Sequence, residues 1–170
     1  MSTVDGPQRE TLRLDGPAPR ILLIQAPYYA EIVGGMRAGV ERVVAEADGI
    51  LDIVDVAGAF ELPAALRMAV DAMDAPEAAH WDGFVLLGCV VRGDTDHYDH
   101  ICREACSGVM NVSTETAVAI GFGLLTVHTI EQAVERSRPP GHDDFRHNKG
   151  AEAAQAALMQ VALRRKWGLG

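Results

Sequence analysis

The sequence lacks the features of a membrane or secreted protein. Its 170 residues contain no apolar run long enough to span a bilayer and no positively charged start followed by an apolar segment. Cysteine is scarce, and the odd number formed by Cys89, Cys102 and Cys106 favours free thiols in a reducing compartment over a disulfide framework. We therefore expect a cytoplasmic protein without membrane association.

Basic residues are also scarce. The formal net charge is -9 at pH 7, and the basic residues cluster only at Arg164, Arg165 and Lys166. Nucleic-acid binding requires a basic surface, so this charge argues against a nucleic-acid partner. The basic triplet fits better as support for the C-terminus of a helix, where the helix dipole favours positive charge.

Length and composition are ordinary for a globular domain. Hydrophobic residues make up 48% of the chain and charged residues 23%. Residues 1–19 are rich in glycine and proline and are interpreted as a flexible tail, within which residues 11–14 have the pattern of a short edge strand. We expect residues 20–170 to form a single domain.

Apolar runs alternate with helical periodicity along the chain. Short apolar runs predict strands, and apolar residues at helical spacing predict helices. The expected strands are at residues 20–25, 50–56, 84–91 and 122–128, and the expected helices are at about residues 32–44, 62–73, 97–112, 130–137 and 149–166. This alternation predicts an α/β fold, a three-layer sandwich with a mainly parallel four-stranded sheet flanked by helices. Ligands of such sheets bind beyond the carboxyl ends of the strands.

A glycine turn around Gly93 joins the third expected strand to the helix that follows. A helix that begins after such a turn offers free N–H groups and the positive end of its dipole to an anion. Asp96 or Thr95 is a candidate cap that would leave His97 in the first turn. Such junctions also occur throughout α/β proteins, and Asp94 and Asp96 would repel a phosphate unless their carboxylates turn away. On this pattern alone, an anion site and an ordinary junction both remain open.

Ordered sequence blocks carry a resemblance to a known enzyme family. The block GCVVRGDTDHYD at residues 88–99 is similar to the signature of the 6,7-dimethyl-8-ribityllumazine synthase family. Further blocks match at residues 58–63 (GAFELP), 122–126 (FGLLT), 130–136 (IEQAVER) and 148–154 (NKGAEAA). The resemblance covers about residues 20–167 and implies a flavodoxin-like fold and a transferase of riboflavin biosynthesis.

The reaction implied by the resemblance condenses 5-amino-6-(D-ribitylamino)uracil with 3,4-dihydroxy-2-butanone 4-phosphate. The products are 6,7-dimethyl-8-ribityllumazine, phosphate and water, and no metal or redox cofactor is required. Such a site must bind phosphate, move protons near pH 7 and offer a flat surface to a heterocycle.

The resemblance assigns catalytic roles to His97 and Arg136. Histidine both donates and accepts protons near neutral pH, and Arg136 matches an arginine whose guanidinium binds two phosphate oxygens. Without the resemblance, a histidine with only local hydrogen bonds and a surface arginine paired with Glu135 or Glu131 would be the ordinary interpretations.

The remaining predicted site residues bind substrate. They are Tyr28, Tyr29, Ala59, Phe60, Glu61, Val90, Val91, Gly93, Asp94, Thr95, Phe122 and Lys149. The resemblance implies a phosphate turn at residues 93–95, ring stacking by Tyr28 and Phe122, and contacts from Glu61 to the ribityl hydroxyls. Tyr29 departs from the asparagine commonly found at its position, which puts one pyrimidine hydrogen bond in doubt. Phe122 is expected at the start of its strand.

Assembly is part of the implied mechanism. In the family, the phosphate turn and the histidine come from one subunit, and the equivalents of Phe122 and Arg136 come from its neighbour. Residues 137–147, SRPPGHDDFRH, are longer than the usual turn where pentamers meet in a sixty-subunit capsid. We therefore expect a homo-oligomer that is a pentamer or a pair of pentamers.

Two other functions were weighed. A metal-dependent hydrolase would use the cluster of Asp96, His97, Asp99, His100, Cys102 and Cys106, although their spacing matches no tetrahedral site. A non-catalytic lumazine- or flavin-binding relative, or a riboflavin synthase of the archaeal type, would share the fold. The joint presence of His97 and Arg136 favours the synthase.

Overall fold

The computed structural model describes residues 14–75, 79–138 and 148–169. Most of the edge strand expected at residues 11–14 therefore lies outside the described residues, as do residues 139–147 of the expected insertion. The elements in chain order are β1 (Arg20–Gln25), α1 (Ala30–Glu46), β2 (Ile50–Asp55), the short 3-10 helix η2 (Ala59–Glu61), α2 (Leu62–Ala72), β3 (Gly83–Val91), α3 (His97–Thr116), β4 (Ala119–Val127), α4 (Ile130–Arg136) and α5 (Lys149–Lys166).

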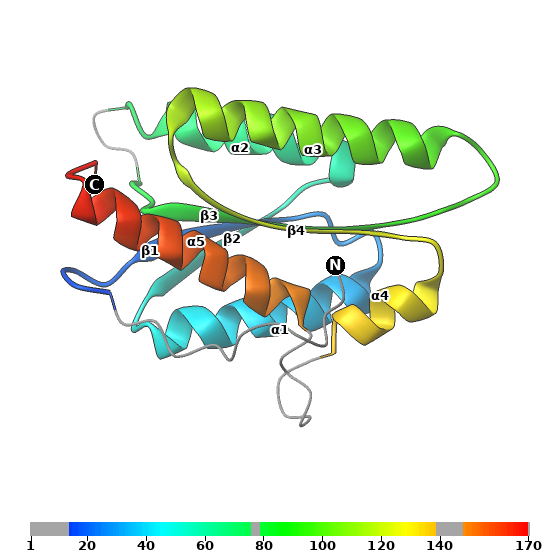
Figure 1. Cartoon of the computed structure of the whole chain (residues 1–170), viewed down its shortest axis with the longest axis horizontal. Helices are drawn as coiled ribbons and strands as arrows, with labels where there is room; N and C mark the ends of the chain where they lie inside the picture. The colour runs from blue at the N-terminus through cyan, green and yellow to red at the C-terminus, as the bar shows by residue number, and fades with distance from the viewer. Residues whose placement is uncertain (1–13, 76–78, 139–147, 170) are drawn as a thin grey trace.

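The four strands form one parallel sheet in the order β2-β1-β3-β4. Figure 1 shows the sheet between two layers of helices, with α2 and α3 on one face and α1, α4 and α5 on the other. β1 and β3 are buried along most of their length because helices cover both of their faces, whereas the edge strand β2 is largely exposed. The predicted three-layer α/β sandwich is confirmed.

Two local predictions were wrong. β4 begins at Ala119 and not near Phe122. The prediction missed the first residues of the strand because Gly121 and Gly123 interrupt its apolar pattern. Asp96 occupies the N-cap position of α3, but its side chain accepts no capping hydrogen bond, and Thr95 is not the cap. The Asp96 backbone is already helical (φ -69°, ψ -3°), whereas a capping side chain normally acts from an extended backbone.

The helix layer formed by α1, α4 and α5, below the sheet in Figure 1, depends on the close approach of α1 and α5. A Cβ atom on Gly150 would overlap the Met36 carbonyl, and one on Gly39 would overlap the Asn148 side chain. Glycine at these positions lets the two helices pack with little space between their backbones. Ala154 and Ala157 of α5 are fully buried in the same core.

Asn148 fixes this contact through hydrogen bonds in three directions. Its Oδ1 accepts from the Ala151 N–H at 3.0 Å and so caps α5, while its Nδ2 donates to the carbonyls of Gly35 (2.9 Å) and Arg138 (2.7 Å). The side chain is fully buried, so its polar atoms have no water to replace these partners. One amide therefore links α1, the second residue after α4 and the start of α5.

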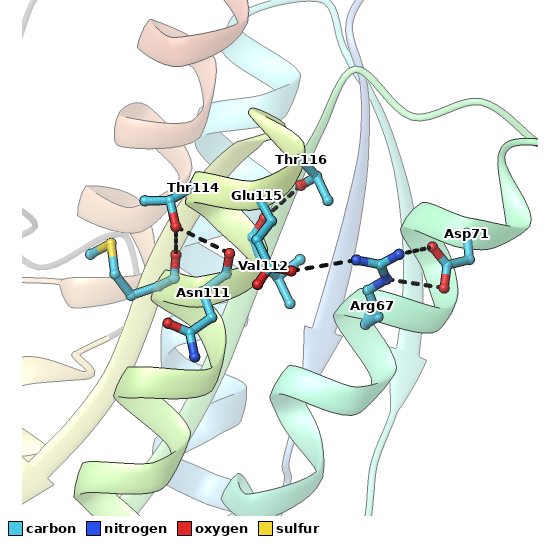
Figure 2. A network of polar contacts seen from close by, with 8 residues as sticks. Arg67, Asp71, Asn111, Val112, Thr114, Glu115 and Thr116 are labelled. Atoms are coloured by element: carbon cyan, nitrogen blue, oxygen red, sulfur yellow. Dashed lines mark hydrogen bonds and ion pairs between the residues drawn. The ribbon is translucent and has the colours of Figure 1, made fainter.

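In the other helix layer, above the sheet in Figure 1, different contacts join α2 to α3. Gly108 of α3 lies against Pro63 of α2, and Arg67 bridges Asp71 at 2.9 Å and Glu115 at 3.7 Å. Figure 2 shows this bridge between the helices beside the threonine bonds near the end of α3, where Thr116 Oγ1 donates to the Val112 carbonyl. Exposed ion pairs of this kind contribute little free energy, so the apolar contacts between the helices dominate.

Among residues 14–75, 79–138 and 148–169, none of the helices combines the length and the apolar character needed to cross a membrane.

Replacing Asn148 with alanine should lower the free energy of unfolding by about 2–4 kcal/mol, because a helix cap and two further buried hydrogen bonds are lost together. Urea unfolding followed by circular dichroism measures this change. The matched control is Asn111→Ala on the exposed side of α3, which should change stability by less than about 0.5 kcal/mol. Equal effects of the two substitutions would contradict the role given to Asn148.

Candidate active site

A hollow of about 660 Å³ opens beyond the carboxyl ends of β1, β2 and β3. We call it the His97 hollow. It is lined by Tyr28, Tyr29, Ala57, Gly58, Ala59, Phe60, Glu61, Cys89, Val90, Val91, His97 and Ile101. Of the predicted site residues, eight meet here from four separate segments of the chain. Its place at the carboxyl ends of parallel strands is the one expected for a ligand site.

The rim of the His97 hollow carries large exposed aromatic rings. Tyr28 is 77% exposed and Phe60 is 56% exposed, although burial is the usual state of such rings. The Tyr28 and Tyr29 rings meet edge to face, with centroids 5.1 Å apart and planes at 71°. Tyr29 is partly buried against the core below the sheet, so it anchors the pair while Tyr28 stays open to solvent.

The connection from β3 to α3 brings His97, which is exposed, into the lining of this hollow. The Arg92 N–H donates to the Val127 carbonyl at 2.9 Å and so continues the pairing of β3 with β4. The Arg92 guanidinium then turns onto the first turn of α3, where it lies 2.8 Å from an Asp99 oxygen and 5.1 Å from the centre of the Tyr98 ring. These contacts hold the start of the helix to the end of the strand.

The predicted phosphate turn at Gly93, Asp94 and Thr95 is exposed and is not part of the hollow's lining. Gly93 has a backbone outside the left-handed region, and a Cβ atom there would meet nothing within 4 Å. Neither backbone conformation nor packing therefore requires glycine at this position. What glycine provides here is open access to the main chain.

The other predicted residues line a second hollow. It has a volume of about 430 Å³ and lies along β4 between α4 and α5. We call it the Arg136 hollow. Its lining residues are Phe122, Gly123, Leu124, Leu125, Thr126, Val127, Arg136, Lys149, Glu152, Ala153 and Ala156. No residue lines both hollows, so the chain divides the predicted site into two parts.

Both cations of the Arg136 hollow have partners within the chain. Arg136 donates through Nη1 to the Gln132 carbonyl at 2.9 Å and lies 3.7 Å from Glu135. The Lys149 ammonium lies 2.8 Å from each carboxylate oxygen of Glu152. An anion that enters this hollow would meet positive charge that carboxylates partly balance.

Helix capping places Arg136. Thr129 is the N-cap of α4, and its hydroxyl accepts from the Gln132 N–H at 3.4 Å, while the Gln132 side chain accepts from the His128 N–H at 2.9 Å. The arrangement differs from a capping box in that Gln132 reaches the N–H of the residue before the cap and not that of the cap itself. It fixes the short helix after β4 and sets Arg136 in its last turn.

Sequence reasoning missed several lining residues. Ala57, Gly58, Cys89 and Ile101 gave no chemical signal because they contribute apolar surface or backbone. Glu152 had a usable signal, since it follows Lys149 by three residues on a helix and such pairs interact. Burial raises the pKa of the Cys89 thiol to about 11, which makes this thiol a poor nucleophile at neutral pH.

Across the described ranges of the chain, no group of three or more His, Cys, Asp or Glu side chains is placed to hold a metal ion. The cluster weighed for a hydrolase, which includes His97 and Cys106, therefore does not converge.

Known proteins resemble this chain over most of its length. A sequence model described as 6,7-dimethyl-8-ribityllumazine synthase matches residues 18–165. The chain belongs to the 6,7-dimethyl-8-ribityllumazine synthase family. A relative with that name from Paramagnetospirillum magneticum is 40% identical over 151 residues, which cover 88% of this chain and 97% of the relative. A relative from Kineococcus radiotolerans is 41% identical over 157 residues, which cover 91% of this chain and 90% of the relative. Both hollows lie within the part that matches the lumazine synthase family.

Gly121 and Gly123 set the distance between β4 and α5 in the Arg136 hollow. A Cβ atom on Gly121 would overlap the Ala153 carbonyl, and one on Gly123 would lie 2.6 Å from Leu87. Phe122 stands between these glycines and is 37% exposed. The two glycines thus bring α5, and with it Lys149, close to the strand that carries Phe122.

Gly121→Ala should lower the free energy of unfolding by about 1–3 kcal/mol, because the added methyl group forces α5 away from β4. Gly34→Ala is the matched control. Gly34 is in α1, nothing lies within 4 Å of the position its Cβ would take, and alanine there should raise the free energy of unfolding by about 0.5–1 kcal/mol. Chemical unfolding measures both changes in the free energy of unfolding. Changes of opposite sign in the two variants would support this account, and changes of the same sign would contradict it.

Proposed function

We propose that the protein condenses 5-amino-6-(D-ribitylamino)uracil with 3,4-dihydroxy-2-butanone 4-phosphate to give 6,7-dimethyl-8-ribityllumazine, phosphate and water. One observation carries the proposal. In a chain of this family, the His97 hollow gathers the predicted histidine with aromatic, apolar and carboxylate side chains at the carboxyl ends of the strands. These are the groups that a proton transfer on a flat, hydroxylated substrate needs.

His97 moves protons in the proposed reaction. The substrate amine attacks the ketone, water leaves to form an imine, phosphate is eliminated, and ring closure releases a second water. Each step needs a proton given or taken near neutral pH, for which imidazole is suited. His97 lies at the first position of α3 and lines the hollow, so its ring is positioned beside a bound heterocycle.

The phosphate group binds at the turn of Gly93, Asp94 and Thr95. This turn precedes a helix of 20 residues, whose dipole favours an anion at its N-terminus. Open space at Gly93 supports the assignment, since a ligand can approach the main chain there. The Asp94 carboxylate must face away from the phosphate.

The pyrimidine stacks on the exposed ring of Tyr28 and lies against Val90 and Val91. Glu61 accepts hydrogen bonds from the ribityl hydroxyls, with Ala59 and Phe60 as neighbouring walls. Tyr29 supplies a phenol where the family commonly has an asparagine. Its partial burial leaves Tyr28 as the more accessible ring.

A complete site in this proposal takes the His97 hollow from one subunit and the Arg136 hollow from its neighbour. Arg136 and Lys149 then neutralise the phosphate, and Phe122 covers the heterocycle. The separation of the two hollows within one chain supports this arrangement. Exposed apolar side chains, such as Ile53 on β2 and Val134 on α4, are typical of surfaces that become buried on assembly.

The assembly that we propose is a pentamer or a decamer in the cytoplasm, with residues 20–170 of each subunit as one domain. The insertion at residues 137–147 is the reason for preferring these states to a sixty-subunit capsid. Sedimentation of the purified protein distinguishes them by mass.

Substitution of either predicted catalytic residue should reduce lumazine formation, measured by absorbance against an enzyme-free blank. His97→Ala should lower kcat by about 10²- to 10⁴-fold, since general acid–base catalysis is lost. Arg136→Ala should raise the KM of the phosphate substrate by about tenfold or more, because charged hydrogen bonds of ~1.5–3 kcal/mol are removed. His100→Ala and Arg103→Ala change exposed residues of α3 outside both hollows and serve as controls. Wild-type rates of lumazine formation in both His97→Ala and Arg136→Ala would contradict the proposal.

Mixed assemblies test whether the site is shared. Subunits carrying His97→Ala and subunits carrying Arg136→Ala, co-expressed with different affinity tags, should regain up to about a quarter of wild-type activity. About one interface in four then joins an intact His97 hollow to an intact Arg136 hollow. Co-assembly of His97→Ala with Glu61→Ala subunits is the control, because both changes damage the same hollow and no interface is intact. Activity equal to that of the single variants in both mixtures would place the whole site within one subunit.

A further inference from the structure

We propose that Cys102 and Cys106 of α3 form a two-thiol binding site for thiophilic trivalent arsenicals. The two residues are four apart on one helix, and neither lines the His97 hollow or the Arg136 hollow. The site is therefore separate from the proposed condensation reaction and does not depend on it.

Helix geometry brings the two thiols to the same side of α3. Residues four apart in a helix have Cβ atoms about 5–6 Å from each other and face the same way. A disulfide needs Cβ atoms about 3.5–4.5 Å apart, so direct oxidation to a disulfide would distort the helix. A bridge with one additional atom between the sulfurs suits this spacing.

Within a single chain, the surroundings leave the pair accessible. Cys106 is exposed and Cys102 is half-buried, so a ligand can reach the first sulfur from solvent and then close onto the second. The remaining cysteine, Cys89, is only 5% exposed on β3. Burial raises the pKa of the Cys102 thiol, and a hydrogen bond from the Tyr98 hydroxyl partly opposes this shift.

With only two thiols, the pair suits a centre that needs two protein ligands better than one that needs four. A structural zinc site takes about four ligands, and no further His, Cys, Asp or Glu in the described ranges joins these thiols to complete such a site. A trivalent arsenical with one carbon substituent needs only two more bonds. Thiolate sulfur is the soft ligand that such centres prefer.

The binding step balances without a redox partner. Phenylarsine oxide reacts with the two thiols to form two As–S bonds, its As–O bonds are broken, and the oxygen leaves as water with both thiol protons. Arsenic remains trivalent, and both sulfurs remain at the oxidation level of a thiol.

The test uses the purified full-length protein in its native assembly, treated with phenylarsine oxide and then with excess glutathione, followed by intact mass analysis. One arsenical per chain should survive glutathione and be released by 2,3-dimercaptopropanol. Attachment at two points should strengthen retention over a single thiol by ~10²–10⁴. No glutathione-resistant adduct on the native protein would overturn the proposal.

Variants separate this pair from other thiols. Cys106→Ser and Cys102→Ser should each abolish the resistant adduct, and Cys89→Ser should retain it. The sharpest control combines Cys106→Ser with Ser107→Cys, which keeps the number of thiols but moves one to a neighbouring exposed position that faces another direction. Retention of the adduct in that variant, or its loss in Cys89→Ser, would show that Cys102 and Cys106 are not the pair.

Discussion

The buried amide of Asn148 is the interaction on which the geometry of the lower layer depends. Its three hydrogen bonds are made inside the protein, where an unpaired polar atom costs free energy, so α1, the end of α4 and the start of α5 must stay in register with one another. Lys149 is the next residue, and Arg136 ends the helix that the amide restrains. The cations of the Arg136 hollow thus owe their positions to a side chain that no ligand would touch.

Charge in the Arg136 hollow is balanced rather than concentrated. Lys149 is held by both oxygens of Glu152, and Arg136 is close to Glu135. In a chain with a net charge of -9, this pairing keeps the cations ordered without creating a strongly positive surface that would attract anions unselectively. A phosphate bound as proposed would have to compete with carboxylates for these groups, so its binding would depend on the second set of contacts that the substrate brings.

The sequence predicted most of the architecture because its strands are nearly continuous apolar runs and its helices have a strong period. It also predicted eight of the side chains that line the His97 hollow, in keeping with parallel strands that bring their carboxyl ends to one edge of the sheet. The start of β4 was not predictable in the same way, because Gly121 and Gly123 are required for contact with α5 and weaken the strand pattern. The missing cap at Asp96 depends on backbone angles, which leave no local signal in the sequence. The separation of Phe122 from His97 depends on where β4 and α5 lie in space, so it was expected from the family resemblance and not from any local pattern.

Gly93 illustrates how differently selection acts on glycines in this fold. Gly39 and Gly150 are constrained by folding, since any larger residue would separate two helices. At Gly93, neither the backbone angle nor the surrounding space excludes a side chain. A population of variants selected only for folded, abundant protein would therefore drift at residue 93 and keep residues 39 and 150. If the turn binds phosphate as proposed, glycine would be kept at residue 93 only where growth depends on that ligand.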